Sequence, residues 1–123
     1  MPQMVHRSIT VRLPLMSKAR PRSFSGQKVP YMPAAYKKWK AEMRAQLAEW
    51  WTDPPLEVVH VLSFRFTGPA RADLDNLIGA VLDCGNKLIW VDDRVSVISK
   101  LTGQHIRAKE KDSSIELRIW YMP

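Results

Sequence analysis

Four aspartates in two short segments are the residues whose types and spacing could do chemistry. Asp73 and Asp75 are separated by one residue, and Asp92 and Asp93 are adjacent to each other further along the chain. Converging carboxylates repel one another, by about 4 kcal/mol for a pair at ~4 Å and an effective dielectric constant of ~20, unless they bind a proton or a cation. Oxygen ligands without histidine or cysteine favour hard ions, so the pattern predicts a site for Mg²⁺ or Mn²⁺.

Helix capping is the alternative role for the first two acids. Asp73 stands where a predicted helix begins, and its carboxylate could accept hydrogen bonds from the first free N–H groups. Asp75 would lie in the first turn, where the helix dipole favours an acid. Asp92 and Asp93 instead stand directly before a predicted strand, where β propensity does not favour adjacent acids.

The segment between the second predicted helix and Asp93 determines whether the two pairs can meet. Residues 85–93, extended at ~3.3 Å each, would span ~30 Å, which exceeds the ~21 Å length of a helix over residues 74–87. We therefore expect this segment to run back along the helix and to bring Asp93 close to Asp73 and Asp75.

Basic residues gather in a different part of the sequence. The 123 residues carry 19 Lys and Arg against 12 Asp and Glu, which gives a formal net charge of +7. Residues 18–44 hold eight basic residues and one acid, whereas residues 73–93 hold five acids. A basic block that binds phosphates and an acidic block that binds a cation are typical of enzymes that cleave phosphodiesters. The alternative is that both blocks are solvated faces.

Candidate DNA-binding residues lie in a loop, along one helix stripe and near the acids. In an extended loop, alternate basic side chains would point the same way, toward a DNA backbone. The alternative is an ordinary solvent-exposed loop and helix surface. The candidates are Lys18, Arg20, Arg22, Lys37, Lys40, Arg44, Arg71 and Lys100.

Composition excludes several classes of protein. Hydrophobic residues make up 46% of the chain, which is enough for a core. No apolar run approaches the ~18 residues of a membrane span, and the N-terminal residues lack the apolar stretch of a secretory signal. One cysteine, Cys84, and three histidines cannot form an internal disulfide or a Cys/His zinc site. We expect a cytoplasmic protein with no membrane partner.

Hydrophobic periodicity predicts an α+β fold, with a mixed β-sheet and two main helices in the order β-α-β-α-β-β. A single domain over residues 1–123 would contain all of these elements. Four prolines make residues 14–33 a loop. Strands are expected over residues 7–13, 56–66, 94–102 and 113–121, and helices over residues 34–51 and 74–87.

Alternation and helical spacing also predict the core. The first helix would bury one stripe, and His60 would share an apolar strand face as a hydrogen-bonded core histidine. Cys84 would be an inert packing residue on the second helix. Trp51 and Trp90 could stack on unpaired bases, or belong to the core or a dimer interface. The buried stripe of the first helix would consist of Tyr36, Trp39, Met43, Leu47 and Trp50.

Three motifs together resemble the signature of the RusA-type Holliday junction resolvases. They are Asp73-Leu74-Asp75-Asn76-Leu77, then Leu82-Asp83, then Trp90-Val91-Asp92-Asp93, and the earlier Lys18-Ala19-Arg20-Pro21-Arg22 is similar to a Lys-x-Arg-Pro-Arg segment of that family. The resemblance covers roughly residues 8–120. It implies a RusA-like fold and a small homodimeric, Mg²⁺-dependent endonuclease. Such enzymes resolve four-way DNA junctions by paired nicks in recombination and repair, and phages and prophages commonly encode them.

The resemblance also implies roles for the acids, position by position. Asp73, Asp75 and Asp93 take the places of the essential metal-binding residues, with Asp92 as a neighbouring metal ligand. One position departs from the pattern, because Gly79 stands where the family usually has a lysine that is thought to serve catalysis. Glycine within a helix costs about 1 kcal/mol relative to alanine, so its presence suggests a close approach.

Three functions remain open at this stage. Lys87 or Lys100 could replace the missing lysine in an active junction endonuclease. The chain could instead bind junctions or branched DNA with reduced or lost catalysis, because of Gly79. It could also be a structural or interaction protein whose acids only cap helices.

Overall fold

The computed structural model describes residues 3–18 and 33–123, and the structural statements below concern those residues. The observed order of helices and strands is β-α-β-α-β-β, which confirms the predicted α+β class. A short 3₁₀ turn at Glu110–Asp112 precedes the last strand. The elements are β1 (Val5–Val11), α1 (Ala34–Trp50), β2 (Val61–Thr67), α2 (Leu74–Gly85), β3 (Leu101–Ile106) and β4 (Ser114–Tyr121).

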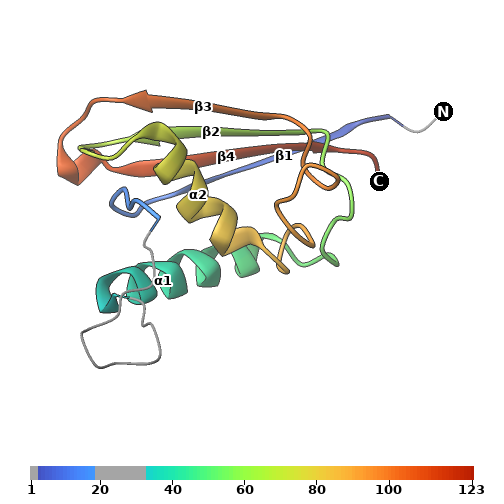
Figure 1. Cartoon of the computed structure of the whole chain (residues 1–123), viewed down its shortest axis with the longest axis horizontal. Coiled ribbons are helices and arrows are strands. Elements are labelled where there is room, and N and C mark those ends of the chain that lie inside the picture. The colour runs from blue at the N-terminus through green and yellow to red at the C-terminus, as the bar shows by residue number, and fades with distance from the viewer. Residues whose placement is uncertain (1–2, 19–32) are drawn as a thin grey trace, which may run out of the picture.

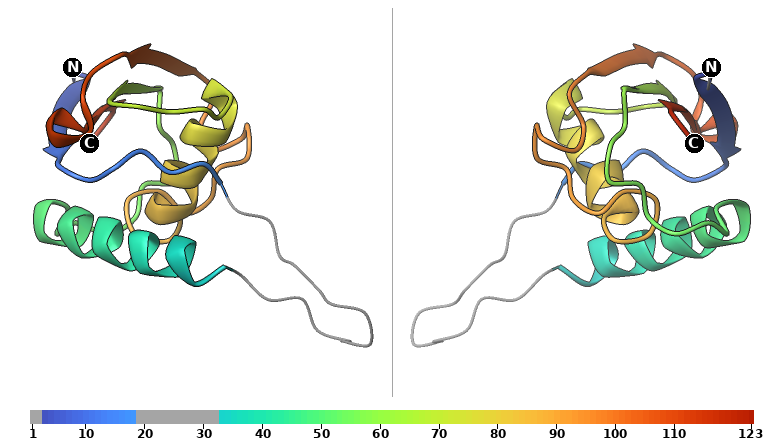
Figure 2. Two further views of the ribbon diagram at one scale, coloured as in Figure 1. Left: turned by 90° about the vertical axis from the view of Figure 1, so that its left-hand side faces the viewer. Right: turned by 90° about the vertical axis from the view of Figure 1, so that its right-hand side faces the viewer.

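The four strands form one mixed sheet in the order β1-β4-β2-β3. β4 pairs antiparallel with both β1 and β2, whereas β2 pairs parallel with β3. Both helices lie on the same side of this sheet, as Figures 1 and 2 show. The opposite face is open and carries polar side chains, among them Arg65 and an ion pair between Arg118 and Glu116 at 3.0 Å.

Alternation along the strands supplies the sheet half of the core. On β4, every second residue from Ile115 to Tyr121 is buried, and Leu62, Phe64 and Phe66 of β2 lie beside them. The stripe predicted for the first helix is confirmed at Tyr36, Trp39, Met43 and Leu47, which are all buried, while Trp50 is half-buried. Burial of these large side chains between helices and sheet is the main stabilising contribution, at about 25 cal/mol per Å² of apolar surface.

The first strand was predicted over residues 7–13 and is observed two residues earlier, at Val5–Val11, while two other predicted strands differ more. Residues 56–60 make only isolated bridges, Leu56 to Trp90 and Val59 to Ile98, so β2 begins later than predicted. The prediction of a core histidine was wrong, because His60 is exposed just before β2. The strand expected over residues 94–102 was also wrong in position: residues 94–98 form a turn, closed by Val97 and Ile98 N–H groups donating to the Arg94 carbonyl, and β3 starts at Leu101.

Trp90 closes the end of α2. The indole is fully buried against Gly85, where a Cβ would overlap the ring, and its Nε1–H donates to Asn86 Oδ1 at 2.9 Å. Trp51 is also buried. Stacking of these two side chains on DNA bases is therefore excluded, and the alternative, that they belong to the core, is confirmed.

Cys84 lies in the core beside this tryptophan turn. Its side chain is fully buried, and desolvation raises the pKa of the thiol to about 12. The predicted packing role of Cys84 is confirmed. In the described part of the chain, neither helix is long and apolar enough to cross a membrane.

Alanine at two glycines of α2 should have opposite effects. Gly85→Ala should lower the free energy of unfolding by about 1–3 kcal/mol, because the added methyl overlaps the Trp90 ring. Gly79→Ala should be neutral or stabilising by up to ~1 kcal/mol, because the flexible Lys18 side chain, whose Cδ would lie 3.1 Å from the new Cβ, can move aside. Urea unfolding of both variants measures the contrast. Equal losses would contradict this account of Gly85.

Candidate functional site

Asp73 and Asp75 stand at the N-terminal end of α2. Asp73 is the N-cap residue, with an extended backbone at φ −68° and ψ 150°, and its carbonyl accepts the N–H groups of Asn76 and Leu77. Its side chain makes no capping hydrogen bond, so the capping role weighed above for this carboxylate is not observed. Both side chains are exposed. These two carboxylates flank the first residue of α2, make no hydrogen bond or ion pair with the described residues, and are suited to bind a cation.

Asp92 and Asp93 lie in the loop between α2 and β3. Asp92 accepts the Asp93 N–H at 2.7 Å, and its other oxygen lies 3.5 Å from Arg94 Nε. The preceding Val91 is fixed beside Leu56, whose carbonyl accepts the Val91 N–H at 2.9 Å. This loop therefore lies at the end of the sheet where β2 begins.

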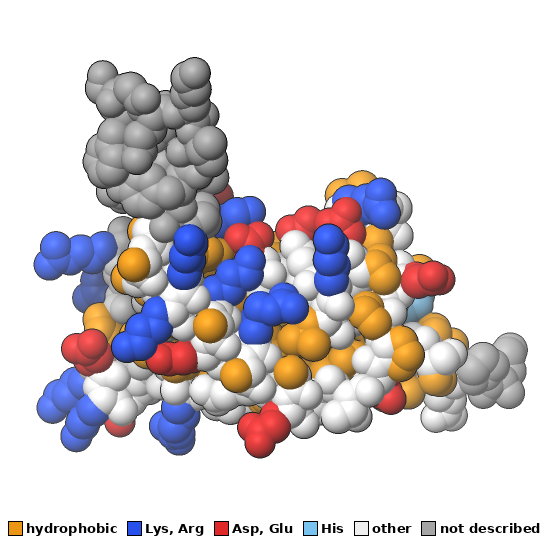
Figure 3. All heavy atoms as spheres, turned by 90° about the horizontal axis from the view of Figure 1, so that it is seen from below, with side chains coloured by type: hydrophobic (Ala, Val, Ile, Leu, Met, Phe, Trp, Pro, Cys, Tyr) orange, Lys and Arg blue, Asp and Glu red, His pale blue; other side chains and the backbone are white. Residues whose placement is uncertain are grey.

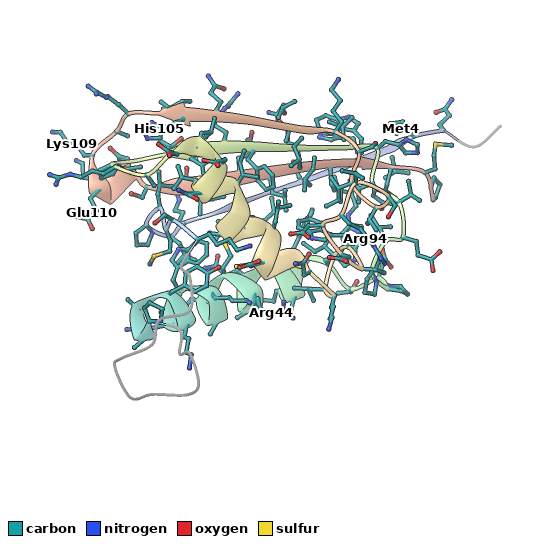
Figure 4. All side chains as sticks on the ribbon, viewed as in Figure 1. Met4, Arg44, Arg94, His105, Lys109 and Glu110 are labelled. Carbon is teal, nitrogen blue, oxygen red and sulfur yellow. The ribbon has the colours of Figure 1, made fainter. Side chains whose placement is uncertain are left out.

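The two acidic pairs occupy opposite ends of β2 within one chain. Asp73 follows the last residues of β2, and Asp93 lies near its start, so the strand of seven residues separates them by about 20 Å at ~3.3 Å per residue. In Figure 4, the labelled residues Arg94 and His105 mark these two opposite ends of the sheet. His105 marks the end where α2 starts, since its Nε2 lies 2.7 Å from the Gly68 carbonyl oxygen.

The expected return of residues 85–93 along α2 was wrong. Residues 86–91 instead form a compact turn under the C-terminal end of the helix, where Leu88 and Ile89 donate to the Gly85 carbonyl. Across residues 3–18 and 33–123, no three His, Cys, Asp or Glu side chains lie close enough to hold a metal ion. The assignment of Asp73, Asp75, Asp92 and Asp93 to a metal site stays a prediction.

Lys18 occupies the face of α2 on which the family lysine is missing. Its backbone N–H donates to the Asn76 carbonyl at 2.9 Å, its side chain crosses Gly79, and its Nζ lies 3.3 Å from Asp83 Oδ1. The glycine thus leaves room for a neighbouring lysine from the loop after β1. Sequence analysis singled out Lys18 as a DNA contact but not as a neighbour of this position.

The two lysines proposed as replacements lie elsewhere. Lys87 is in the turn after α2, with a left-handed φ of 67°, and Lys100 directly precedes β3. Both are therefore at the end of the sheet far from Asp75. Of the described lysines, Lys18 is the one that packs on Gly79.

Asp83 joins three segments of the fold in one polar cluster. The Tyr36 hydroxyl donates to Asp83 Oδ2 at 2.8 Å, and Lys18 binds the other oxygen. Burial and the neighbouring carboxylate raise the pKa of Tyr36 far above its usual value. The cluster fixes the start of the basic loop and α1 against α2, so it positions the helix that carries Asp73 and Asp75.

The basic residues predicted to bind DNA have different surroundings. Lys37, Arg71 and Lys100 are exposed, and Lys40 is half-buried on α1. Arg44 donates to the carbonyls of Cys84 and Asn86, at 2.9 and 3.2 Å, and so caps the C-terminal end of α2. Figure 3 shows many basic side chains on the face that carries the helices. Arg20 and Arg22 lie outside the described residues.

Comparison with known families identifies the class of this protein. The sequence model described as Endodeoxyribonuclease RusA matches residues 13–119, which is most of the chain, and the protein belongs to that family. The family consists of endodeoxyribonucleases that act on Holliday junctions. A search of curated proteins found no match.

Removal of Asp83 should destabilise the fold. Asp83→Ala leaves the buried Tyr36 hydroxyl without its acceptor, so the free energy of unfolding should fall by about 1–3 kcal/mol. The exposed Glu57 offers a matched control, since Glu57→Ala should change it by less than ~0.5 kcal/mol. In a double-mutant cycle, Tyr36→Phe should recover part of the loss. Additive effects of the two substitutions would show that the hydrogen bond contributes nothing.

Proposed function

We propose that this protein is a Mg²⁺-dependent Holliday junction resolvase that acts as a homodimer and makes paired nicks. The observation that carries the proposal is the exposed acid pair Asp73 and Asp75 at the start of α2, in a chain of the RusA family. Two nicks in opposed strands need two sites, and each chain has one such acid pair. Roles in recombination and repair follow from this activity.

The donor set fits a hard divalent cation. Asp73, Asp75, Asp92 and Asp93 offer oxygen ligands alone, which suits Mg²⁺ or Mn²⁺. When bound, such an ion orients the phosphate, lowers the pKa of a water and stabilises the leaving oxygen. The carboxylates hold that charge next to the scissile phosphate, and the helix that begins at Asp73 directs its free N–H groups to the same place.

Basic side chains supply the affinity for DNA. Among the described residues, the candidates without a side-chain hydrogen bond or ion pair are Lys37, Lys40, Arg71 and Lys100, and Lys18 lies beside α2. Each phosphate that they neutralise should add ~0.9 to the slope of log affinity against log salt. Two protomers would double this basic surface around the four arms of one junction.

A homodimer could also bring together the acids that are separated within one chain. Asp93 lies too far from Asp73 and Asp75 of the same chain to share their metal. We infer that a site that uses all three carboxylates takes Asp93 from a second protomer. A two-fold axis would create two such sites, one for each nick.

Asp75→Asn should abolish nicking while junction binding persists or tightens, because the substitution removes a metal ligand and a negative charge that repels phosphate. Nicking of a synthetic four-way junction with Mg²⁺ or Mn²⁺ and a gel-shift assay measure the two effects, with linear duplex as control. Undiminished cleavage would exclude this site. Wild-type protein that shifts junctions but does not nick them would favour the alternative, a junction-binding protein with catalysis lost through Gly79.

Mixed dimers test whether the site is shared between protomers. In a shared site, a dimer of Asp75→Asn with Asp93→Asn keeps one site in which all three acids are intact. Each variant alone should therefore be inactive, whereas the co-refolded mixture should nick one strand of the junction. An inactive mixture of mixed dimers would indicate that each chain completes its own site.

A further inference from the structure

The side chain of Lys18 lies along the face of α2 that begins at Asp75. Residues four apart on a helix share a face, so Asp75, Gly79 and Asp83 form one row on α2. Lys18 crosses this row at its middle, because a Cβ at Gly79 would lie 3.5, 3.9 and 3.1 Å from Lys18 Cβ, Cγ and Cδ. The space that the glycine leaves open is thus filled by the stem of a lysine from the loop after β1.

A side chain at position 79 would compete with this lysine for the same space. A Cβ 3.1 Å from Lys18 Cδ is closer than ordinary van der Waals contact. Glycine within a helix costs about 1 kcal/mol relative to alanine. The backbone does not require it, because φ is positive at Gly68 but not at Gly79. The glycine is therefore explained by the room that it gives to Lys18.

Lys18 Nζ is held by a partly exposed ion pair. It lies 3.3 Å from Asp83 Oδ1, and the lysine side chain is 46% exposed. Ion pairs at the surface contribute about 0–1 kcal/mol. The other Asp83 oxygen accepts the Tyr36 hydroxyl at 2.8 Å, so the carboxylate keeps a partner when the ammonium group leaves. Lys18 can therefore leave Asp83 at a small cost in free energy.

The backbone of Lys18 stays close to Asp75 whichever way the side chain points. Its N–H donates to the Asn76 carbonyl at 2.9 Å, which holds the lysine against the first turn of α2. Since Cβ atoms four residues apart on a helix are ~5–6 Å apart, Lys18 Cβ lies within ~10 Å of Asp75 Cβ. Rotation about χ1 would turn the flexible four-carbon stem from Asp83 toward a phosphate bound at Asp75.

The charges at the start of α2 favour such a movement. Asp73 and Asp75 are exposed, and a divalent ion bound there would neutralise both carboxylates. The negative charge of the phosphate would remain without a counter-charge. In hydrolysis a bond forms between a water oxygen and phosphorus while a bridging P–O bond breaks, which leaves one strand with the phosphate and the other with a hydroxyl. Negative charge grows on the non-bridging oxygens in the transition state, where a fixed cation stabilises it.

We propose that Lys18 is a catalytic residue that leaves Asp83 when DNA binds and contacts the scissile phosphate beside Asp73 and Asp75. The proposal rests on the proposed nuclease function and adds to it a residue from outside α2. Lys18 acts as a positive charge at the non-bridging oxygens and transfers no proton.

Exchange of lysine for methionine separates the charge from the packing. Lys18→Met keeps an unbranched stem over Gly79 and removes the ammonium group. The single-turnover rate of nicking at saturating protein should fall roughly 10²-fold, as when one positioned donor is lost from a charged transition state. Lys111→Met is the matched control, at an exposed lysine between Glu110 and Asp112, and should leave the rate unchanged. An unchanged rate in Lys18→Met would overturn the proposal.

A lysine on the helix itself distinguishes catalysis from structure. In the double variant Lys18→Met with Gly79→Lys, the new ammonium group starts one turn from Asp75 on the same face. Nicking should recover most of the lost rate, whereas Lys18→Met with Gly79→Met, which has the same stems and no charge, should stay slow. Circular dichroism identifies the folded variants. A folded lysine double variant that nicks no faster than Lys18→Met would overturn the proposal.

Junction binding without metal gives a readout that does not depend on cleavage. In EDTA, the slope of log affinity against log salt should be steeper by ~0.9 for the wild type than for Lys18→Met, because one phosphate contact is lost. A wild type that shows this difference but does not nick junctions would refute the proposed nuclease function and support the phosphate contact. A wild type that nicks junctions, with equal slopes for both proteins, would refute the contact and support the nuclease.

Discussion

The parallel pairing of β2 with β3 determines where the candidate functional residues of this chain can lie. Two adjacent parallel strands need a connection that returns the chain to the starting end of the sheet, and α2 is that connection. Residues before the helix, such as Asp73, must then lie at one end of the strands, and residues after it, such as Asp93, at the other. No choice of side chain can change this separation, because it follows from the direction of the backbone.

The return connection is held in place at the C-terminal end of α2. Gly85 admits the Trp90 ring against the last turn of α2, and Arg44 caps the carbonyls there. In the same last turn, Asp83 binds Tyr36 of α1 and Lys18 of the loop after β1. These contacts leave the first turn, with its exposed carboxylates, as the part of the helix that faces solvent. The C-terminal end of the helix is thus fixed by packing, whereas the carboxylates at its N-terminal end are accessible to solvent.

Sequence periodicity predicted the elements that bury one face. The first helix was recognised from its stripe of large apolar residues, and β4 from its alternation, because burial on one side imposes those periods. The prediction misplaced β3 because both faces of this strand are exposed. Without burial on one side, its sequence shows no hydrophobic alternation. His60 was assigned to the core because the alternation of β2 extends in sequence to residues that precede the strand.

The candidate site was only partly predictable. The types and spacing of the acids identified them, and the N-cap position of Asp73 was expected from the sequence. The separation of the acids between two ends of the sheet was not expected. Residues 85–93 are long enough to run back along α2, but they form a turn in which Trp90 packs against the end of the helix. The contact of Lys18 with Gly79 depends on the tertiary path of a loop, and its only sequence signal was a glycine within a helix.

The backbone hydrogen bond from Lys18 to Asn76 couples two segments that lie far apart in the sequence. Lys18 is the last described residue before the segment that contains Arg20 and Arg22, and Asn76 is the neighbour of Asp75. The hydrogen bond therefore fixes the position of Lys18 relative to the first turn of α2. A displacement of Lys18 would therefore also displace the backbone next to Asp75.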